Sequence, residues 1–317
     1  MYWGVCMRKF YLLPIIISIS VLNVTAQQTP QFSQNMFNQM AINPGFAGSS
    51  DMICATAINR QQWVGFDGAP ATTVININSP FRLFGQSHGA GITVYNDKYA
   101  FNNDIDINLN YAYRLPLANG KLGIGAAAGF INPSLNPTWK DPEGGTGTGD
   151  PNIPQQKESV MSFDLSFGLY YQTDKMYFGL SAQHLNKPAI NKTTNPSVLD
   201  RTYYLSSGYN LSLPNPSFEI IPSIFMVTDG VSSSFTVNTN VLYNKRIWGG
   251  VSYRLNDAVT AMFGIELFNG IRLGYAYDYS LSALSGYNDG THEFMVSYCF
   301  TLKKEKPPQR YKSIRFL

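Results

Sequence analysis

Composition and charge restrict this chain of 317 residues to a few classes of protein. Charged residues make up 14% of it and aromatic residues another 14%, and the formal net charge is +3. Soluble domains average about 25% charged residues, so this chain is poor in charge. The small positive charge, concentrated near the C-terminus, does not suggest nucleic-acid binding. No apolar run after residue 26 approaches the roughly 20 residues of a spanning helix, which favours a membrane β-barrel and leaves a soluble β-sandwich as the alternative.

The chain begins with the features of a cleavable export signal. Arg8 and Lys9 precede an apolar core at 11–21, and residues 24–26 (Val-Thr-Ala) resemble a signal cleavage site. The apolar core is short for a membrane anchor. The sequence therefore predicts a signal peptide at 1–26 and a mature chain that starts at Gln27.

Residues 27–50 form a separate N-terminal segment ahead of the first predicted strand. Phe32 to Met40 have room for one or two helical turns, which Asn43-Pro44 would end. We expect this segment to plug the lumen of the barrel or to cap its periplasmic mouth.

Residues 51–302 contain fourteen short segments in which every second residue is apolar or aromatic. The clearest is DIDINLNYAYR at 104–114, with isoleucine, leucine and tyrosine on one face and mainly polar residues on the other. A period of two indicates β-strands, and an apolar stripe that ends in tyrosines indicates lipid on one side and a wet lumen on the other. The predicted strands are 51–61, 71–79, 88–97, 101–114, 119–131, 159–172, 175–184, 200–213, 216–227, 233–243, 246–255, 258–268, 270–279 and 290–302. The predicted fold is all-β, a transmembrane antiparallel up-and-down barrel of about fourteen strands.

The lengths of the connections agree with this strand count. The three longest, 132–158, 185–199 and 280–289, all follow odd-numbered strands, whereas several connections after even-numbered strands are two-residue turns. Bacterial barrels have long extracellular loops, short periplasmic turns and both termini in the periplasm. If one strand were miscounted, some of the long connections would fall on the periplasmic side.

Polar residues on the inward faces predict a charged network inside the barrel. A charge that faces lipid at mid-depth costs about 2–4 kcal/mol, so charged residues of the strands are assigned to the lumen. The predicted lumen network consists of Asp104, Asp106, Arg114, Asp164, Arg254, Glu266, Arg272, Asp278 and Glu293. Both signs occur on the late strands, so we expect these side chains to pair across the lumen. Inward glycines such as Gly168 and Gly274 would leave room for water or a plugging segment.

Two cysteines and a basic tail lie near the ends of the mature chain. Cys54 and Cys299 are on the first and last strands, which become neighbours on closure, so a disulfide is geometrically possible; two unpaired thiols are the preferred interpretation. Residues 303–317 carry six Lys or Arg residues and are predicted to form an extended periplasmic tail.

The sequence offers little that suggests catalysis. It has no G-x-S-x-G, no H-E-x-x-H and no phosphate-binding glycine loop, so we predict no enzymatic activity and no cofactor. His88, His184 and His292 are interpreted as girdle or loop residues, with a barrel esterase as a minor alternative. The glycine-rich stretch 141–152 lacks EF-hand spacing and is predicted to be a flexible extracellular loop without a metal.

Four stretches resemble one protein family. They are PQFSQNMFNQMAINPGFAGS (30–49), RQQWVGFDGAPATT (60–73), YFGLSAQHLNKP (177–188) and LGYAYDYSLSALSGYNDGTHEFMVSY (273–298). Together they span the mature chain, in the order in which they occur in the PorP/SprF family of outer-membrane proteins of the Bacteroidetes type IX secretion system.

The resemblance implies a non-enzymatic barrel in the outer membrane that binds other proteins. Its implied partners are either a periplasmic ring lipoprotein with its partner subunit and a peptidoglycan-binding protein, or the C-terminal domain of a secreted adhesin, as in gliding motility. A candidate partner-contact loop contains Trp63, Phe66, Asp67, Gly68 and Pro70. The alternative function is that of a general porin or a hydrophobic-solute channel, which the inward charges would suit.

Overall fold

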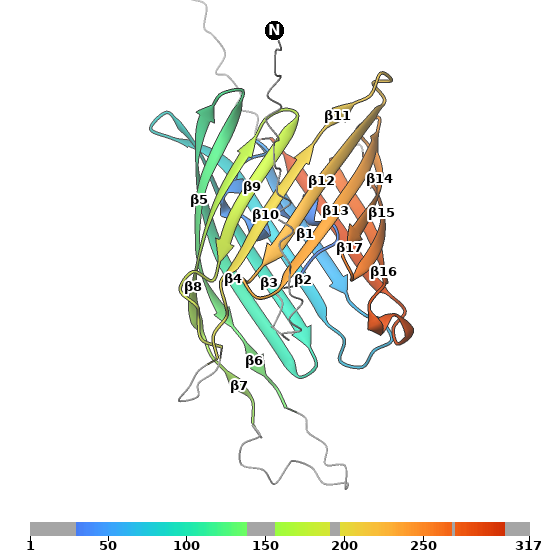
Figure 1. Ribbon diagram of the computed structural model, residues 1–317. Coiled ribbons are helices and arrows are strands. Elements are labelled where there is room, and N and C mark those ends of the chain that lie inside the picture. Colours follow the sequence, from blue (N-terminus) through green and yellow to red (C-terminus); the bar gives the residue numbers. More distant parts are fainter. Residues whose placement is uncertain (1–29, 138–155, 191–196, 268–269, 302–317) are drawn as a thin grey trace, which may run out of the picture.

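The strands of the computed structural model form one closed antiparallel barrel. The structure describes residues 30–137, 156–190, 197–267 and 270–301. Closure follows from the pairing of β1 (Ile53–Gln61) with both β2 (Ala71–Leu83) and β17 (Thr291–Phe300), so that the first and last strands are neighbours (Figure 1). The other long strands are β3 (Gln86–Tyr99), β4 (Asn102–Leu117), β5 (Gly120–Asn132), β8 (Ser162–Gln172), β9 (Met176–Gln183), β10 (Thr202–Tyr209), β12 (Phe218–Thr228), β13 (Ser233–Tyr243), β14 (Ile247–Arg254), β15 (Ala258–Glu266) and β16 (Ile271–Ser280).

The strand count and the strand positions predicted from the sequence are confirmed. The described residues contain fourteen long strands, and the ends of these strands lie within four residues of the predicted ends. Three two-residue strands, β6 (Ser134–Leu135), β7 (Glu158–Ser159) and β11 (Leu211–Ser212), extend individual hairpins. The predicted signal peptide, the tail 303–317 and the loop 141–152 lie outside the described residues.

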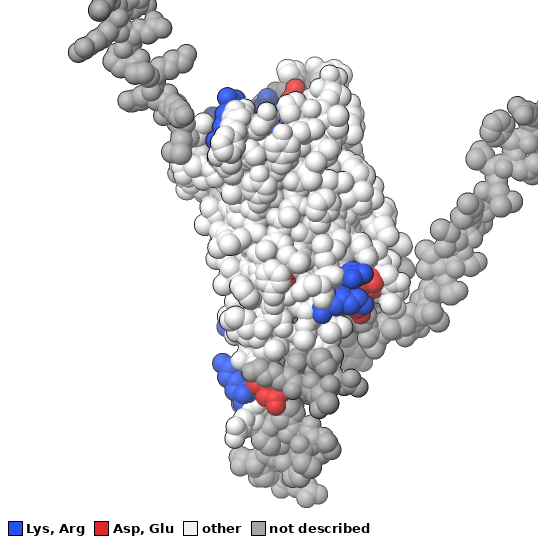
Figure 2. All heavy atoms as spheres, turned by 90° about the vertical axis from the view of Figure 1, so that its left-hand side faces the viewer, with Lys and Arg blue, Asp and Glu red and all other residues white. Residues whose placement is uncertain are grey.

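Alternation of exposed and buried side chains shows which face of each strand meets the bilayer. In β8, Phe163, Leu165 and Phe167 are exposed on the outside, whereas Asp164 and Ser166 are buried on the inside. Charged side chains gather at the two ends of the wall and leave a broad band between them almost without charge (Figure 2). This is the pattern of a barrel in lipid, where the outer face replaces water contacts with hydrocarbon. Among the described residues, no helix is long and apolar enough to cross a bilayer.

The two ends of the barrel carry connections of different length. Tight turns such as Phe84-Gly85 and Asn244-Lys245 lie at one end, and each of these four residues has a positive φ, as two-residue hairpins require. The longer connections lie at the opposite end, which is the lower end in Figure 1. We call this the extracellular end and the other the periplasmic end, following the usual asymmetry of bacterial barrels.

The N-terminal segment from residue 30 to residue 50 lies within the barrel. Its helical turns are η1 (Asn35–Phe37), α1 (Gln39–Ile42) and η2 (Pro44–Phe46). The first two agree with the one or two turns predicted for this stretch, but Asn43-Pro44 does not end the helical structure, because Pro44 begins a third turn. Asn43 separates the last two, and its side chain accepts a hydrogen bond from the Gly45 amide at 2.9 Å. Because these turns are too short to be stable alone, their conformation depends on contacts with the barrel wall.

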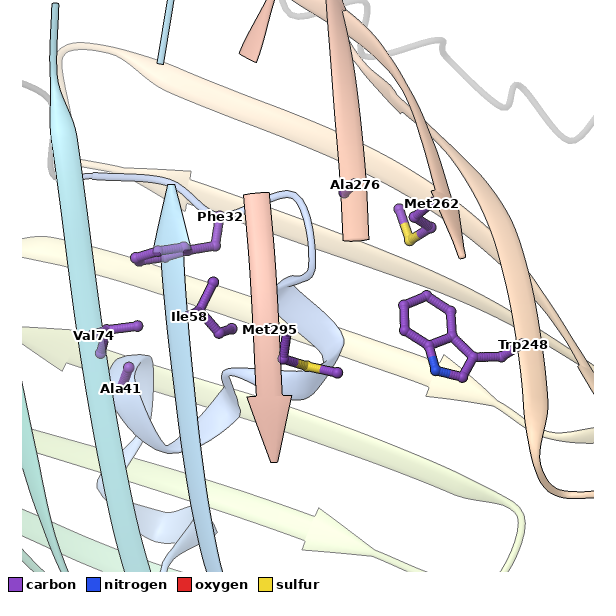
Figure 3. Packing of buried hydrophobic residues seen from close by; sticks show 8 residues of the cluster. All are labelled: Phe32, Ala41, Ile58, Val74, Trp248, Met262, Ala276 and Met295. Atoms are coloured by element: carbon purple, nitrogen blue, oxygen red, sulfur yellow. The ribbon is translucent and has the colours of Figure 1, made fainter. Parts of the chain in front are cut away.

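A hydrophobic cluster joins this segment to inward-facing strand residues. Phe32 and Ala41 of the segment pack with strand residues that come from both sides of the closure, as Figure 3 shows. The strand members are Ile58, Val74, Trp248, Met262, Ala276 and Met295. In a water-filled lumen these inward-facing apolar side chains would be exposed to water. The N-terminal segment covers them with its own apolar side chains, which is energetically favourable.

Inward glycines allow the segment to approach the wall closely. A Cβ at Gly168 would lie 2.1 Å from Oδ1 of Asn43, and a Cβ at Gly274 would lie 2.4 Å from Oε1 of Gln34. Both distances are shorter than a van der Waals contact, so a larger residue at either position would have to displace an amide side chain of the segment. The room expected inside the barrel at these two positions is therefore occupied by the segment.

The two barrel cysteines form a disulfide, so the preference for unpaired thiols was wrong. Cys54 and Cys299 are directly opposite one another in the β1–β17 pair, with Cα atoms 4.1 Å apart. The sequence could not establish the register of these strands, and a shift of one residue would have turned one thiol outward. The bond links the first and last strands near the periplasmic end.

Candidate functional site

Charged residues from the strands around the closure converge on one residue of the N-terminal segment. We call this set the seam cluster: Ser33, Arg60, Arg254, Thr260, Asp278 and Glu293. All six are buried, and they lie near the extracellular ends of β1, β14, β15, β16 and β17. The site is thus built where the closure brings the two ends of the chain together.

Arg60 is the central cation of the seam cluster. Its guanidinium lies 2.8 Å from Oδ2 of Asp278 and 3.2 Å from Oε2 of Glu293, and it donates a hydrogen bond to Oγ of Ser33 at 2.9 Å. Arg254 also donates to the Ser33 hydroxyl, at 3.3 Å. Arg254 also forms an ion pair with Asp257, 2.9 Å away at the end of the strand. Each guanidinium of the cluster therefore has at least one carboxylate partner in a place where an unpaired charge would be costly.

The two carboxylates of the cluster hold the backbone and side chain of the segment. Glu293 accepts hydrogen bonds from the amides of Ser33 and Gln34, both at 2.8 Å. Asp278 accepts one from the Ser33 hydroxyl at 2.7 Å and one from Thr260 at 2.8 Å. Hydrogen bonds to ionised acceptors are about twice as strong as neutral ones, so this contact fixes the turn that begins the segment.

A second polar group lies on the opposite wall. Asp164 of β8 is buried, and its Oδ2 atom lies 3.1 Å from Nδ1 of His184. In the same part of the lumen, Asp104 accepts hydrogen bonds from the Tyr99 hydroxyl at 3.0 Å and from the Ser134 amide at 3.2 Å. His184 lies in the connection directly after β9, as a loop residue would, but its side chain is buried beside the inward carboxylate of Asp164 and is not part of an outer girdle. Asp106 of β4 lies within electrostatic reach of His184, Asp104 and Asp164 and belongs to this second group.

The other three members of the predicted lumen network lie apart from both groups. Glu266 and Arg272 are cross-strand neighbours, 2.8 Å apart at the periplasmic mouth and partly exposed. Arg272 also lies over the ring of Phe37, 5.8 Å from its centre. Arg114 is buried near the periplasmic mouth, and its Nε and Nη1 atoms have no hydrogen-bond partner among the described residues.

The expectation that the late strands pair their charges across the lumen is therefore wrong. Glu293 of β17 pairs with Arg60 of the neighbouring first strand, Asp278 of β16 reaches the same Arg60 two strands away, and Glu266 pairs with Arg272 on the next strand. The N-terminal segment, rather than a direct ion pair, connects opposite walls: Ser33 contacts β16 and β17, and the Asn43 side chain donates to the Leu169 carbonyl of β8 at 2.9 Å.

Sequence reasoning missed Ser33, Arg60, Thr260 and His184 as members of these groups. Arg60 is an even number of residues from the inward-facing Cys54 and therefore lies on the same face of the strand. The apolar and polar residues of the first strand alternate poorly, however, so the sequence does not show which face of this strand points into the lumen. Ser33 carries no charge and no motif that marks it. It was found only because the closed barrel places it among four charged side chains.

The candidate partner-contact loop, 62–70, is fastened at both ends. The Trp63 amide donates to the Thr291 hydroxyl at 3.1 Å, and the carbonyl of Gly68 accepts from the Ala100 amide at 2.9 Å. Gln62 donates to the Pro70 carbonyl at 2.9 Å, which closes the base of the loop. At its tip, Phe66 is exposed and Asp67 lies next to it in the chain.

The other histidines lie on the outer face. The His292 ring is hydrogen-bonded to the Tyr275 hydroxyl at 2.7 Å and packs against Tyr277, and His88 is 2.8 Å from the Tyr111 hydroxyl. Both positions agree with the prediction that these two histidines are girdle or loop residues. Within the described parts of the chain, no three His, Cys, Asp or Glu residues gather as a metal site would require.

Comparison with solved structures finds other membrane barrels at low identity. The chain is 12% identical to the Ralstonia pickettii toluene transporter TbuX, covering 83% of this chain and 93% of that one with a TM-score of 0.47. It is 11% identical to the CymD monoaromatic hydrocarbon channel (84% and 93%, TM-score 0.48) and 8% identical to the Acinetobacter baumannii outer membrane protein Omp33 (78% and 99%, TM-score 0.46). At such distances no argument about cargo or activity follows.

Comparison with protein families gives a direct assignment. No curated protein matches the chain. The model described as type IX secretion system membrane protein PorP/SprF, however, matches residues 24–298, which is most of the chain and includes the N-terminal segment, the seam cluster and the loop 62–70. This barrel protein therefore belongs to the PorP/SprF family of type IX secretion system membrane proteins.

Proposed function

We propose that this protein is a non-enzymatic export and docking component, which binds other subunits of the secretion machine or a secreted surface adhesin. Family membership makes it a membrane component of type IX secretion, and the barrel is one of the outer membrane. The proposal adds that its task is recognition of proteins rather than conduction of solutes. A cleavable signal at 1–26 would deliver the chain to the periplasm.

One observation carries this proposal: the N-terminal segment occupies the lumen. The segment buries residues 32–35 and 38–45 almost continuously inside the barrel. It is held by the seam cluster at one end and by hydrogen bonds from Ser181 to the Ile42 carbonyl (2.6 Å) and from Gln183 to the Ala41 carbonyl (2.8 Å) farther along. A porin needs an open water path, so a segment fixed in this way acts as a plug in our proposal.

Planar-bilayer conductance of the purified full-length protein tests this proposal against the porin alternative. We expect no steady current from the wild-type protein. The variant Glu293→Ala removes the carboxylate that accepts the hydrogen bonds of the Ser33 and Gln34 amides, so it should loosen the N-terminal segment and show intermittent channel openings. The control variant Glu266→Ala, at the periplasmic mouth, should show none. Steady open-pore current from the wild-type protein would establish the channel function and contradict ours.

The geometry around the histidines supports a non-enzymatic role. A barrel esterase needs a serine hydroxyl beside a histidine. His184 is instead bonded to Asp164, and His292 to the Tyr275 hydroxyl, and among the described residues no serine hydroxyl bonds to either ring. We therefore expect no ester hydrolysis by the purified protein. Hydrolysis abolished by His184→Ala or by His292→Ala would revive the esterase alternative.

The two candidate sets of partners contact opposite ends of the barrel. Ring subunits of the machine would meet the periplasmic turns, and an adhesin domain would meet the extracellular loops. Affinity purification from native membranes under mild detergent separates the two. Recovery of periplasmic ring components would assign the core role, recovery of one large secreted protein would assign the adhesin role, and recovery of neither would contradict the proposal.

A further inference from the structure

A pocket lies on the extracellular rim of the barrel, next to the closure. It has a volume of about 360 Å³ and is lined by Tyr277, Tyr279, Ser280, Ser285, Asn288, Asp289 and Gly290. We call it the rim pocket. Its tyrosines come from the outer face of β16, and its other wall is the loop between β16 and β17, which contains the short helix η3 (Ala283–Gly286).

The loop that forms the pocket wall is held in a defined conformation. The Asn288 side chain donates to the Leu284 carbonyl and accepts from the Gly290 amide at 2.8 Å. The Tyr277 hydroxyl donates to the Asp289 carbonyl at 3.1 Å. These bonds leave the pocket formed in the absence of any ligand, which lowers the ordering cost of binding.

The loop 62–70 is joined to the same wall. The Val64 amide donates to the Gly290 carbonyl at 2.9 Å, and the Asp289 amide donates to the Val64 carbonyl at 2.8 Å. The two loops therefore form one surface across the closure, visible side by side at the lower right of Figure 1. Phe66 and Tyr287 are exposed on it, with 50% and 75% of their surface accessible.

Asp289 is the charged group of the rim pocket. The residue is exposed, and its carboxylate lies beside Gly65 of the loop 62–70, where a Cβ would be 3.0 Å from Oδ2. The other lining side chains are tyrosine rings, hydroxyls and an amide. Aromatic faces and a carboxylate together favour a cation, which gains from both the ring quadrupole and the opposite charge. Phosphate and other anions are disfavoured because no lining residue is basic.

The surroundings of the pocket also carry negative charge. Four neighbouring extracellular connections, 229–232, 255–257, 281–290 and 62–70, contain the aspartates 229, 257, 289 and 67 and no Lys or Arg. Of these, Asp257 is balanced by Arg254 at the end of β14, so the excess negative charge comes from the other three. The connection between β9 and β10 differs, since Lys187 and Arg201 accompany Asp200 there. A positively charged partner is therefore attracted to this part of the rim rather than to the whole extracellular end.

We infer that the rim pocket binds an arginine or lysine side chain of a protein partner at the cell surface, with Phe66 and Tyr287 providing apolar contact beside it. This inference rests on the proposed function and specifies the chemistry of its extracellular partner. Arginine fits best, because its planar guanidinium stacks on a tyrosine ring while it donates to a carboxylate.

A pair of model peptides tests the inference on the full-length protein in a non-ionic detergent. The probes are acetylated, amidated tetra-arginine and the neutral analogue tetra-citrulline, with affinity measured by calorimetry. The variants are Asp289→Asn and, as the matched control, Asp200→Asn, which removes an exposed carboxylate from the other side of the rim. Heat-modifiability on gels checks that each variant forms a barrel.

We expect Asp289→Asn to weaken tetra-arginine binding about tenfold or more, the loss typical of one charge-assisted contact, and Asp200→Asn to leave it unchanged. Tetra-citrulline should bind at least tenfold more weakly than tetra-arginine. Equal effects of the two variants, or displacement of the peptide by a neutral oligosaccharide such as maltotriose, would overturn the inference. Native partners captured equally by wild type and Asp289→Asn would also overturn it while leaving the proposed function intact.

Discussion

Replacement of Arg60 by alanine should destabilise the barrel strongly, because it breaks the centre of the seam cluster. The guanidinium is buried, forms ion pairs with Asp278 and Glu293, and donates to Ser33. Without it, two carboxylates remain buried, and the one cation left in the cluster, Arg254, already pairs with Asp257.

The expected loss follows from the burial of the group. Removing one partner of a buried ion pair costs about 3–5 kcal/mol, because the remaining charge is left without compensation. The matched control is Arg272→Ala. Arg272 also forms an ion pair at 2.8 Å, but 38% of its side chain is exposed, so the expected loss is about 0–1 kcal/mol.

Urea unfolding of the barrel in lipid vesicles, followed by heat-modifiability on gels, measures the difference. With a slope of about 3 kcal/mol per molar urea, Arg60→Ala should lower the midpoint by about 1–2 M, and Arg272→Ala by no more than about 0.3 M. Arg60→Met combined with Glu293→Gln should recover part of the loss, because one carboxylate is neutralised together with the cation and the remaining one, Asp278, still interacts with Arg254. Equal midpoints for the two single variants would refute the claim that the cluster stabilises the fold.

Three further predictions concern the wall, the closure and one loop. Leu109→Arg, at the middle of the outer face of β4, should lower the free energy of unfolding by about 2–4 kcal/mol in the same assay, whereas Leu117→Arg at the periplasmic end of β4 should lower it by about 0–1 kcal/mol. Similar losses for the two variants would contradict the position of the barrel in the membrane. Replacing both Cys54 and Cys299 by serine should lower the unfolding free energy by about 2–4 kcal/mol, and wild-type protein that reacts with thiol reagents before reduction would show that the bond is absent. At Asp229, burial would raise the pKa, but hydrogen bonds from the backbone of Ser232 and Val231 outweigh it and lower the pKa below its ordinary value. Because the pKa of Asp229 is lower in the folded protein, these hydrogen bonds hold the loop in place above the ordinary pKa of aspartate, and the loop loses them as the pH falls through the lowered pKa. An NMR titration that gives Asp229 an ordinary or raised pKa would contradict this.

The strands could be located from the sequence because a two-residue period is a local property. The face of each strand is fixed by the cost of placing charge in lipid, which is why Asp164, Asp278 and Glu293 were correctly assigned to the lumen. The count of fourteen followed from the same period together with the lengths of the connections. Each of these features depends on residues close together in the chain.

The candidate site depends on residues that are far apart in the chain, and only closure of the barrel determined it. The register between β1 and β17 decides that Arg60 faces Glu293 and that Cys54 meets Cys299 across 245 positions. A period of two fixes the facing of a side chain but not its partner on the next strand, since every even shift preserves the pattern. The place of Ser33 among four buried charges likewise follows from the path of the N-terminal segment through the lumen, which the local sequence does not encode.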